Sequence, residues 1–397
     1  MEAFLSFLQL ENLQNYLQQN KLKAINKTLE VDNSGTKNFL ETLDLLVVNG
    51  YKSFIYTGNN PIKILCLIIL KLHNEISVSL SEEPIGELNF SRYKSSSLFI
   101  SKAGENEFSI FTSGTTGKPK KVVVDLEDLI LKITPTNDKN FKWILTYNPK
   151  SFAGLQVLLT AVISDNVIYF SLDSSVTSLL KIIQKYKINA VSATPTFWRV
   201  FLSSSFKDTH NLELITLGGE LIEESLLKKL VEIYPDAKIT QIYATTEFGK
   251  IFSVSDKKAG FPIEFINKYK LKIKNDELFV KYENEYMSTK DKVKIMEDRV
   301  FFVGRNSDFL KVAGNKVNIK SIEQKLLNLK NVSDAKINFQ SSKIVGNILT
   351  LDVVLVKDNE SERMNLKKMC RSTLETYEIP KIINFLPVLK TNSNLKK

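Results

Sequence analysis

The spacing of apolar and polar positions changes along the chain. Over 4–13 and 62–72 the apolar residues recur as they do on one face of a helix, and a polar turn is expected at 32–35 between them. From residue 108 onward, short β-rich runs alternate with amphipathic stretches of helical length, as where Val167–Phe170 precedes Val176–Tyr186. Repetition of strand, helix and strand predicts crossover connections and a mostly parallel sheet.

After Gly260 the pattern becomes short alternating runs, which predict antiparallel strands near 277–280 and 300–303. The last ninety residues predict helices over 320–329 and 364–377 and strands over 335–339 and 349–356. We therefore expect an α/β protein with two domains. A large domain over 1–303 has mostly parallel sheets flanked by helices plus a small β part, and residues 304–397 form a small α+β domain.

Composition excludes several classes of protein. The chain is 43% apolar, which is enough for a sizeable core, and its longest unbroken apolar run, 64–70, is far shorter than the ~18 residues of a membrane span. The start, Met1-Glu2, lacks the basic region of a signal peptide, so we expect a cytoplasmic protein without a membrane span. Two cysteines and two histidines are too few for a disulfide framework or a Cys/His zinc site.

The formal net charge is +10, and most of the excess lies near the C-terminus. Residues 308–397 contain 16 Lys or Arg against 9 Asp or Glu, a net +7. Such a segment attracts a polyanion, a nucleotide or an acidic protein, although a solvated lysine-rich surface gives the same count. Aromatic residues are not interleaved with basic ones as on a single-strand platform, so nucleic acid is not an expected partner.

The sharpest local motif follows the extended run 108–111. Small residues let successive backbone N–H groups converge on phosphate oxygens, hydroxyls add donors, and lysine adds charge. These features are combined in Thr112, Ser113, Gly114, Thr115, Thr116, Gly117 and Lys118. A Walker A loop would need Gly at Thr112 and Ser or Thr at Pro119, so this is a different phosphate-binding loop or, alternatively, a solvent-exposed turn.

The motif resembles the signature loop of the adenylate-forming superfamily, which comprises acyl-CoA synthetases, peptide-synthetase adenylation domains and luciferases. Further motifs follow in the family's order, so the resemblance covers roughly residues 100–397. Among members, this compact chain is most similar in look to o-succinylbenzoate–CoA ligases. The resemblance implies that Gly218, Gly219 and Glu220 form the adenine-binding turn.

The segment 241–247 resembles the family's Tyr-Gly-x-Thr-Glu element. The resemblance implies that Tyr243 packs on adenine, Thr246 contacts phosphate and Glu247 holds Mg²⁺. Ala244 replaces the family's glycine and adds a methyl group where the acyl chain would enter.

Downstream, Asp291 lies where the family's Thr-Gly-Asp carboxylate accepts from the ribose hydroxyls, with Lys290 in place of glycine. An ordinary surface Lys-Asp pair is the alternative. Arg305 would contact ribose or phosphate, and either Ser307 or Asp308 would be the hinge of a mobile C-terminal domain.

Two lysines complete the resemblance. Lys316 falls where the family often has an arginine near the nucleotide or the incoming thiol. The register from Phe385 places Lys396 at the position of the family's catalytic lysine. Asn392 and Leu395, however, replace the threonine and the glycine that the family has nearby. A solvated terminal lysine is the alternative interpretation.

For the acyl pocket, the resemblance indicates Phe152, Gly154 and Ala244. Phe152 replaces the family's histidine and would give an apolar wall. Thr160 lies where o-succinylbenzoate ligases tend to have an arginine, so we do not expect a dicarboxylate substrate. Phe197 and Trp198 belong either to this pocket or, as is commoner after a strand, to the core.

The resemblance implies ATP-dependent activation of a small carboxylic acid as an acyl-adenylate, with Mg²⁺ and pyrophosphate release. Lys118 and Lys396 would act on the phosphates and the reacting carboxylate. The acyl group would then pass to a thiol, either coenzyme A or the phosphopantetheine of an acidic acyl carrier protein. The alternative is a non-catalytic homologue that binds a nucleotide or a carrier protein.

Overall fold

The computed structural model describes residues 22–24, 33–81, 91–92, 97–103, 105–113, 119–136, 141–171, 176–204, 212–305, 308–312, 315–342, 346–387 and 389. The chain divides into two compact units, Met1–Ser192 with His210–Leu214 and Ala193–Thr209 with Ile215–Lys397. The α/β class is confirmed, whereas the boundary after residue 303 stays a prediction. Over the described ranges, the chain has no helix of the length and apolarity that a membrane crossing needs.

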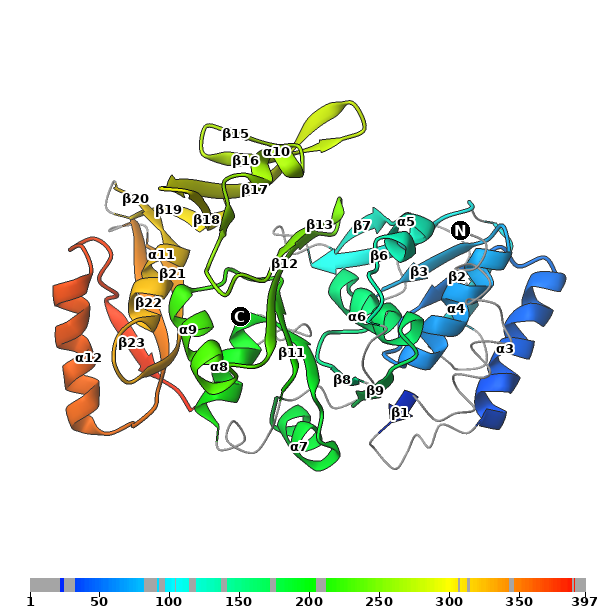
Figure 1. Cartoon of the computed structure of the whole chain (residues 1–397), viewed down its shortest axis with the longest axis horizontal. Helices are drawn as coiled ribbons and strands as arrows, with labels where there is room; N and C mark the ends of the chain where they lie inside the picture. The colour runs from blue at the N-terminus through cyan, green and yellow to red at the C-terminus, as the bar shows by residue number, and fades with distance from the viewer. Residues whose placement is uncertain are drawn as a thin grey trace. The chain divides into compact units, whose positions relative to one another are not determined.

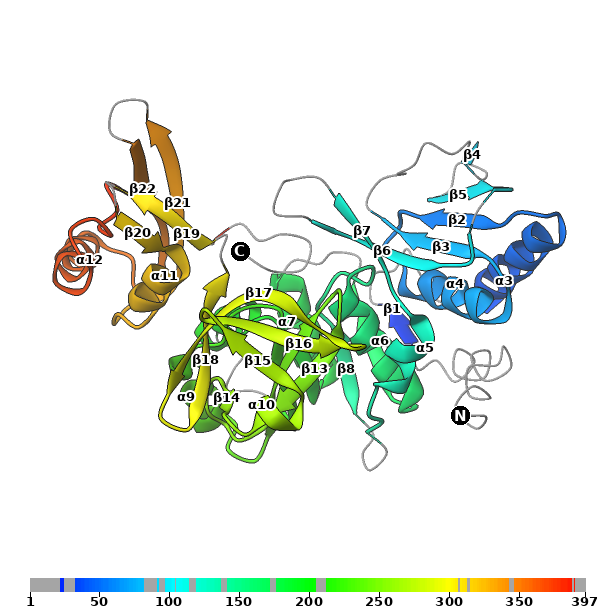
Figure 2. The ribbon, with the colours of Figure 1, turned by 90° about the horizontal axis from the view of Figure 1, so that it is seen from above.

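The first unit contains a six-stranded mixed sheet in the order β4-β5-β2-β3-β6-β7. Its strands are β2 (Ser53–Tyr56), β3 (Ser77–Leu80), β4 (Ser91–Arg92), β5 (Leu98–Ser101), β6 (Phe108–Ser113) and β7 (Pro119–Val123). The pairs β2/β3 and β3/β6 are parallel and the others are antiparallel. Helices α3 (Asn33–Val48) and α4 (Pro61–His73) lie on the same side of this sheet, as Figure 2 shows.

Part of this unit differs from the sequence prediction. The helix expected over 62–72 is confirmed by α4, which begins at Pro61 and is capped by Asn60 Oδ1, an acceptor for Ile62 N at 2.9 Å. The polar turn expected at 32–35 is wrong for residues 33–35, which begin α3. The helix expected over 4–13 lies outside the described residues. Strands β2 and β3 were not predicted, because every residue in them is buried and no alternation marks them.

The first unit also contains the parallel strands that the sequence predicted. They are β1 (Leu22–Ala24), β8 (Lys142–Leu145), β9 (Val167–Phe170) and β10 (Ala190–Ala193), in the order β1-β9-β8-β10. The described pairs among them are all parallel. Between the strands lie α5 (Leu126–Leu131), α6 (Phe152–Ile163) and α7 (Val176–Tyr186). Both β9 and α7 span the residues that the pattern predicted.

The second unit begins with a helix and a β11-β12-β13 run of strands. Its first elements are α8 (Pro195–Ser203), β11 (Leu214–Gly218), α9 (Glu224–Ile233), β12 (Lys238–Thr245) and β13 (Gly249–Val254). Strands β12 and β13 form a long antiparallel hairpin, which is visible in Figure 1. The two strands are joined by the tight turn 245–249, so the polar residues of this turn lie together at the end of the hairpin.

The antiparallel strands expected after Gly260 are confirmed as a five-stranded sheet, β14-β18-β17-β16-β15. The elements are β14 (Phe261–Pro262), α10 (Phe265–Lys268), β15 (Leu271–Lys274), β16 (Glu277–Tyr282), β17 (Glu285–Met296) and β18 (Arg299–Arg305). An apolar cluster that includes Phe252, Phe261 and Val300 joins this sheet to the β12–β13 hairpin. The hairpin and the sheet therefore share one core.

The described part of residues 308–397 folds as the predicted mixture of helices and strands, although the second helix spans 360–373 rather than 364–377. The elements are β19 (Phe309–Val312), β20 (Asn315–Asn318), α11 (Ile319–Leu327), β21 (Val332–Ser342), β22 (Gly346–Leu355), α12 (Glu360–Thr373) and β23 (Ile382–Phe385). Leu349, Leu351 and Val353 alternate along β22 and pack on Leu326 of α11 and Leu366 of α12. Both helices therefore cover the same side of the β21-β22-β23 sheet, as Figure 2 shows.

A glycine near the start of α6 allows the tight turn before that helix. A Cβ at Gly154 would lie 2.0 Å from the backbone oxygen of Asn148, and the Gly154 N–H donates to the N-cap Ser151 Oγ at 3.1 Å. Neither the carbonyl nor the helix start can move without losing this cap. Any larger residue at 154 therefore strains the backbone.

We predict that Gly154→Ala lowers the free energy of unfolding by about 1–3 kcal/mol, the usual cost of overpacking. The comparison is Gln156→Ala on the same helix, for which a change below about 0.5 kcal/mol is expected. Urea unfolding of both variants measures the difference. Equal stabilities of the two variants would contradict the close packing of Gly154.

Candidate functional site

The first group of predicted site residues lies on the β12–β13 hairpin. The ring of Tyr243 packs against two phenylalanines, with centroid distances of 5.1 Å to Phe252 and 4.5 Å to Phe302. The pairing of β12 with β13 shifts between Tyr243 and Ala244. In the turn, buried Thr245 accepts from the Phe248 N–H through Oγ1 at 3.1 Å. This contact fixes the turn that carries Thr246 and the exposed Glu247.

A buried carboxylate connects this hairpin to the five-stranded sheet. Asp291 is only 8% exposed, and both of its oxygens have donors. The Tyr243 hydroxyl donates to Oδ2 at 2.6 Å, and Arg305 Nε donates to Oδ1 at 2.8 Å. Burial, and secondly the charge of Asp291, raise the pKa of the Tyr243 phenol, so it stays protonated as a donor. Strands β12, β17 and β18 thus meet at one carboxylate.

The alternative of an ordinary surface Lys-Asp pair does not describe Asp291, because its ion-pair partner is Arg305 and its side chain is buried. Lys290 is exposed and has φ of 63°, in the left-handed region that favours glycine. The Lys290 N–H donates to Ser288 Oγ at 2.9 Å. The backbone at Lys290 therefore has a left-handed conformation that glycine, the residue expected here from the motif, adopts without strain.

The predicted adenine-binding turn follows β11. Gly219 has φ of +81°, and a Cβ at Gly218 would lie 3.2 Å from the Ile242 oxygen on β12. The positive φ favours glycine at 219, and the close approach of β12 leaves little room for a side chain at 218. Glu220 accepts through Oε2 from Thr196 N at 2.9 Å and from Thr196 Oγ1 at 2.7 Å. The start of α8 thereby fixes the carboxylate that ends the turn.

The predicted hinge is described in part. Asp308 Oδ2 accepts from the Arg305 N–H at 2.6 Å, and a Cβ at Gly304 would lie 2.9 Å from the same oxygen. Gly304 has φ of +123°, which requires glycine. Asp308 thus closes a short loop after β18, whereas Ser307 lies outside the described residues.

The predicted pocket residues lie in both units. In the first unit, Phe152 is buried at the start of α6, beside Gly154. In the second unit, Ala244 is half-buried on β12. Phe197 and Trp198 are fully buried, and Trp198 Nε1 donates to Thr216 O at 3.1 Å. The core interpretation of these two aromatics is confirmed.

Several predicted site residues belong to parts of the chain outside the described ranges. Gly114, Thr115, Thr116, Gly117, Lys118 and Lys396 lie outside the described residues, as do the side chains of Thr112, Ser113 and Lys316. The backbone on either side of the predicted phosphate loop is described, since β6 and β7 pair up to Ser113 and Pro119. The roles of these residues stay predictions.

Sequence reasoning missed Arg199 on α8. Its side chain is 10% exposed and pairs with Glu223 at 3.0 Å and with Asp334 at 3.4 Å. The only sequence signal was an arginine within the otherwise apolar helix that follows Thr194-Pro195. That signal does not identify the two carboxylates that pair with Arg199, because both lie in distant segments of the sequence.

Comparisons with known proteins agree with the motifs. The family model described as AMP-binding enzyme matches residues 75–280. Tyrocidine synthase 3 of Brevibacillus parabrevis is 27% identical over 173 residues, which cover 41% of this chain but only 3% of that much longer protein. The D-alanine–D-alanyl carrier protein ligase of Staphylococcus epidermidis is 24% identical over 399 residues, 83% of this chain and 79% of the relative.

Among solved structures, the anthranilate CoA ligase AuaEII, in complex with anthranoyl-AMP, matches with a TM-score of 0.66. The match covers 96% of this chain and 94% of that one at 13% sequence identity. At this identity the likeness shows a shared fold.

We predict that Lys290→Gly raises the free energy of unfolding by about 0.5–1 kcal/mol, because glycine has no Cβ to strain at positive φ. Lys290→Ala removes the same charge but keeps a Cβ, so no gain is expected. Chemical denaturation of the three proteins measures the effect. A gain shared equally by both variants would assign it to the charge instead and contradict the backbone explanation.

Proposed function

The chain belongs to the AMP-binding enzyme family, and on that premise we propose that it activates a small carboxylic acid with ATP and transfers the acyl group to a thiol. One observation carries the proposal. Tyr243, Asp291 and Arg305 come from three separate motifs and form one hydrogen-bonded cluster. Its carboxylate, at the centre, is suited to accept the ribose hydroxyls of a nucleotide.

The first step joins two anions, so charge repulsion opposes it. The enzyme must therefore accelerate the step by positioning the two reactants and stabilising the charge that develops. A carboxylate oxygen of the acid attacks the α-phosphorus of ATP and forms a new O–P bond. The bond from the α-phosphorus to the β-phosphate oxygen breaks, and pyrophosphate leaves with the electron pair. In our proposal Lys118 and its loop hold the β- and γ-phosphates, and Lys396 bridges the carboxylate and the α-phosphate.

Glu247 is the residue proposed to hold Mg²⁺. It is exposed on the turn between β12 and β13, next to Thr246. A single carboxylate fits Mg²⁺, which keeps several waters and takes further oxygens from phosphates. When bound, the ion would neutralise charge that develops on the departing pyrophosphate.

In the second step, the sulfur of a thiol attacks the acyl carbon and forms a C–S bond. The bond from the acyl carbon to the AMP oxygen breaks, AMP leaves, and the thiol proton passes to solvent. We propose that residues 304–397 turn about Ser307–Asp308 between the two steps and bring Lys316 near the thiol donor. Both coenzyme A and a phosphopantetheine carrier protein suit the net +7 of 308–397.

The proposal predicts acid-dependent exchange of labelled pyrophosphate into ATP. The panel contains small aliphatic, aromatic and amino acids, with dicarboxylates as the disfavoured class because of Thr160. At least one monocarboxylic acid is expected to raise exchange about tenfold or more above the acid-free rate, a change of about 1.4 kcal/mol in the barrier. Product masses with coenzyme A and with a holo carrier protein then identify the acceptor.

ATP binding without exchange for any acid would contradict the proposed function and favour a non-catalytic nucleotide-binding homologue. Absence of ATP binding would contradict both. Asp256→Asn is the control variant for the assay, since its Arg299 ion pair, at 2.6 Å, lies apart from the Asp291 cluster. Its exchange rate should match that of the unaltered protein.

A further inference from the structure

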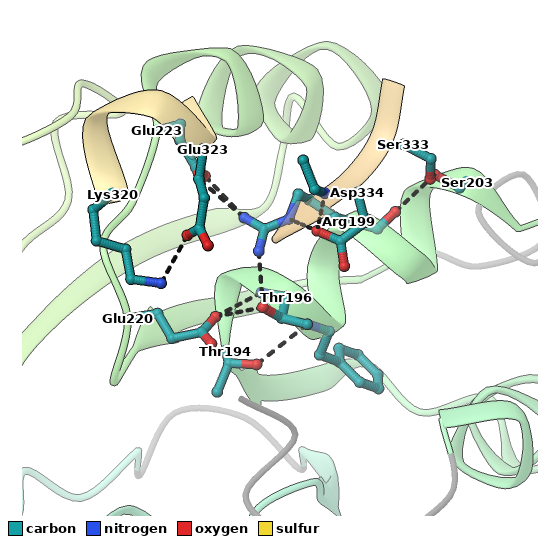
Figure 3. A network of polar contacts seen from close by, with 12 residues as sticks. Thr194, Thr196, Arg199, Ser203, Glu220, Glu223, Lys320, Glu323, Ser333 and Asp334 are labelled. Carbon is teal, nitrogen blue, oxygen red and sulfur yellow. Dashed lines mark hydrogen bonds and ion pairs between the residues drawn. The ribbon is translucent and has the colours of Figure 1, made fainter. Parts of the chain in front are cut away.

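Arg199 of α8 is a buried arginine that contacts its own helix, the N-cap of α9 and strand β21, all within the second unit. Its Nη1 donates to both oxygens of Glu223, at 3.0 and 3.1 Å, and its Nη2 donates to Thr196 Oγ1 at 2.8 Å. Its Nε lies 3.4 Å from Asp334 Oδ1 on β21. Figure 3 shows the guanidinium between these partners. The planar fork of arginine fixes the three contacts relative to one another, so a change at one partner reorients the others.

The contact with Thr196 connects Arg199 to the Gly218–Glu220 turn. A guanidinium can only donate, so the Thr196 hydroxyl uses its single proton for Glu220 Oε2, at 2.7 Å. The Thr196 N–H also donates to this oxygen, at 2.9 Å. Thr196 is the second residue of α8, where a backbone N–H has no partner within the helix. Glu220 therefore replaces the missing partner, and its position depends on the start of α8.

The contact with Asp334 connects Arg199 to the C-terminal segment. Asp334 is 4% exposed and accepts from its neighbour Ala335 N at 3.0 Å. Next to it, Glu323 of α11 accepts from Ile337 N at 2.9 Å and from Lys320 Nζ at 2.7 Å. The carboxylates of Glu323 and Asp334 thus lie near Arg199. The carboxylates of Glu220 and Glu223 lie near the same arginine.

The charges explain why these contacts depend on one another. Glu220, Glu223, Glu323 and Asp334 all interact with the Arg199 charge. Burial lowers the pKa of Arg199, but the carboxylates outweigh burial and leave that pKa above its ordinary value. Buried carboxylates at close range repel one another unless a cation lies between them. The arginine therefore stabilises the turn and the C-terminal segment as one arrangement.

We propose that Arg199 is a positioning residue that couples the Gly218–Glu220 turn to the segment around Asp334. While Asp334 pairs with Arg199, the Arg199–Thr196–Glu220 contacts hold the turn in one conformation. When that pairing is lost, Glu220 loses its fixed position. The inference rests on the proposed function in one respect, namely that the turn binds the adenine nucleotide. Because coupling is reciprocal, a nucleotide bound at the turn would in return stabilise the pairing of Asp334 with Arg199.

The test is hydrogen–deuterium exchange of the full chain, read at the Thr196 amide and over residues 214–222. Asp334→Asn keeps the shape of the side chain but removes its charge. We expect it to speed exchange at both places about fivefold or more, without any ligand. Thr196→Val should speed exchange over 214–222 to a similar degree, and Thr196→Ser, which keeps the hydroxyl, should restore the slow rate.

The matched control is Ser203→Ala. Ser203 of α8 hydrogen-bonds Ser333 of β21 at 2.9 Å, so it joins the same two elements without touching Glu220. Hydrogen exchange over 214–222 in the Ser203→Ala protein should equal that in the unaltered protein. If Asp334→Asn behaves like Ser203→Ala, the coupling does not exist. The double variant of Thr196→Val and Asp334→Asn should exchange no faster than Thr196→Val alone, because both changes break one path. Additive effects would overturn the proposal in favour of two independent structural roles.

A second arm adds ATP as the probe. In the unaltered protein ATP should slow exchange over 214–222, and in the Asp334→Asn variant its affinity should fall about fivefold or more. If ATP protects nothing while Asp334→Asn still speeds exchange at the turn, the coupling stands and the proposed function fails. The two failures are therefore distinguishable.

Discussion

A buried carboxylate must have donors for its charge, and Asp291 is the position where this requirement organises the second unit. Removal of an ionised carboxylate from water costs several kcal/mol unless hydrogen bonds or a counter-charge replace the solvent. Tyr243 and Arg305 provide them from two other strands. The aromatic packing of Tyr243 with Phe252 and Phe302 fixes the direction of the phenol. Hairpin and sheet are thereby aligned around one polar group.

The same physical rule acts at Arg199, with the signs reversed. There the buried Arg199 lies among carboxylates from the N-cap of α9, from α11 and from β21, and the Glu220 turn is held at the edge of this cluster. Both clusters bring together residues that are distant in sequence and leave a carboxylate next to a predicted nucleotide-binding motif. Electrostatics within the second unit thus sets the positions of Glu220 and Asp291.

Sequence reasoning predicted the elements wherever the residues repeat with a clear period. The amphipathic helix Val176–Tyr186 and the strand Val167–Phe170 match the prediction at both ends. Uniformly buried elements escaped it, as in Ser53–Tyr56 and Ser77–Leu80, because burial on both faces removes the alternation. The motifs indicated Asp291 and Arg305, but not that the Tyr243 phenol would bond the same carboxylate. Arg199 stayed unnoticed, because its partners are set by tertiary packing alone.

The central claim is that Asp291 anchors a nucleotide through its ribose, and binding of ATP and of 2′,3′-dideoxy-ATP measures it most directly. The unaltered protein should bind ATP about tenfold or more tightly than the dideoxy analogue, because a hydrogen bond to a charged group contributes about 1.5–3 kcal/mol. Asp291→Asn should lower the affinity for ATP to that for the analogue, whereas Asp256→Asn should keep the preference. An Asp291→Asn protein that still distinguishes the two nucleotides as well as the unaltered protein does would contradict the account.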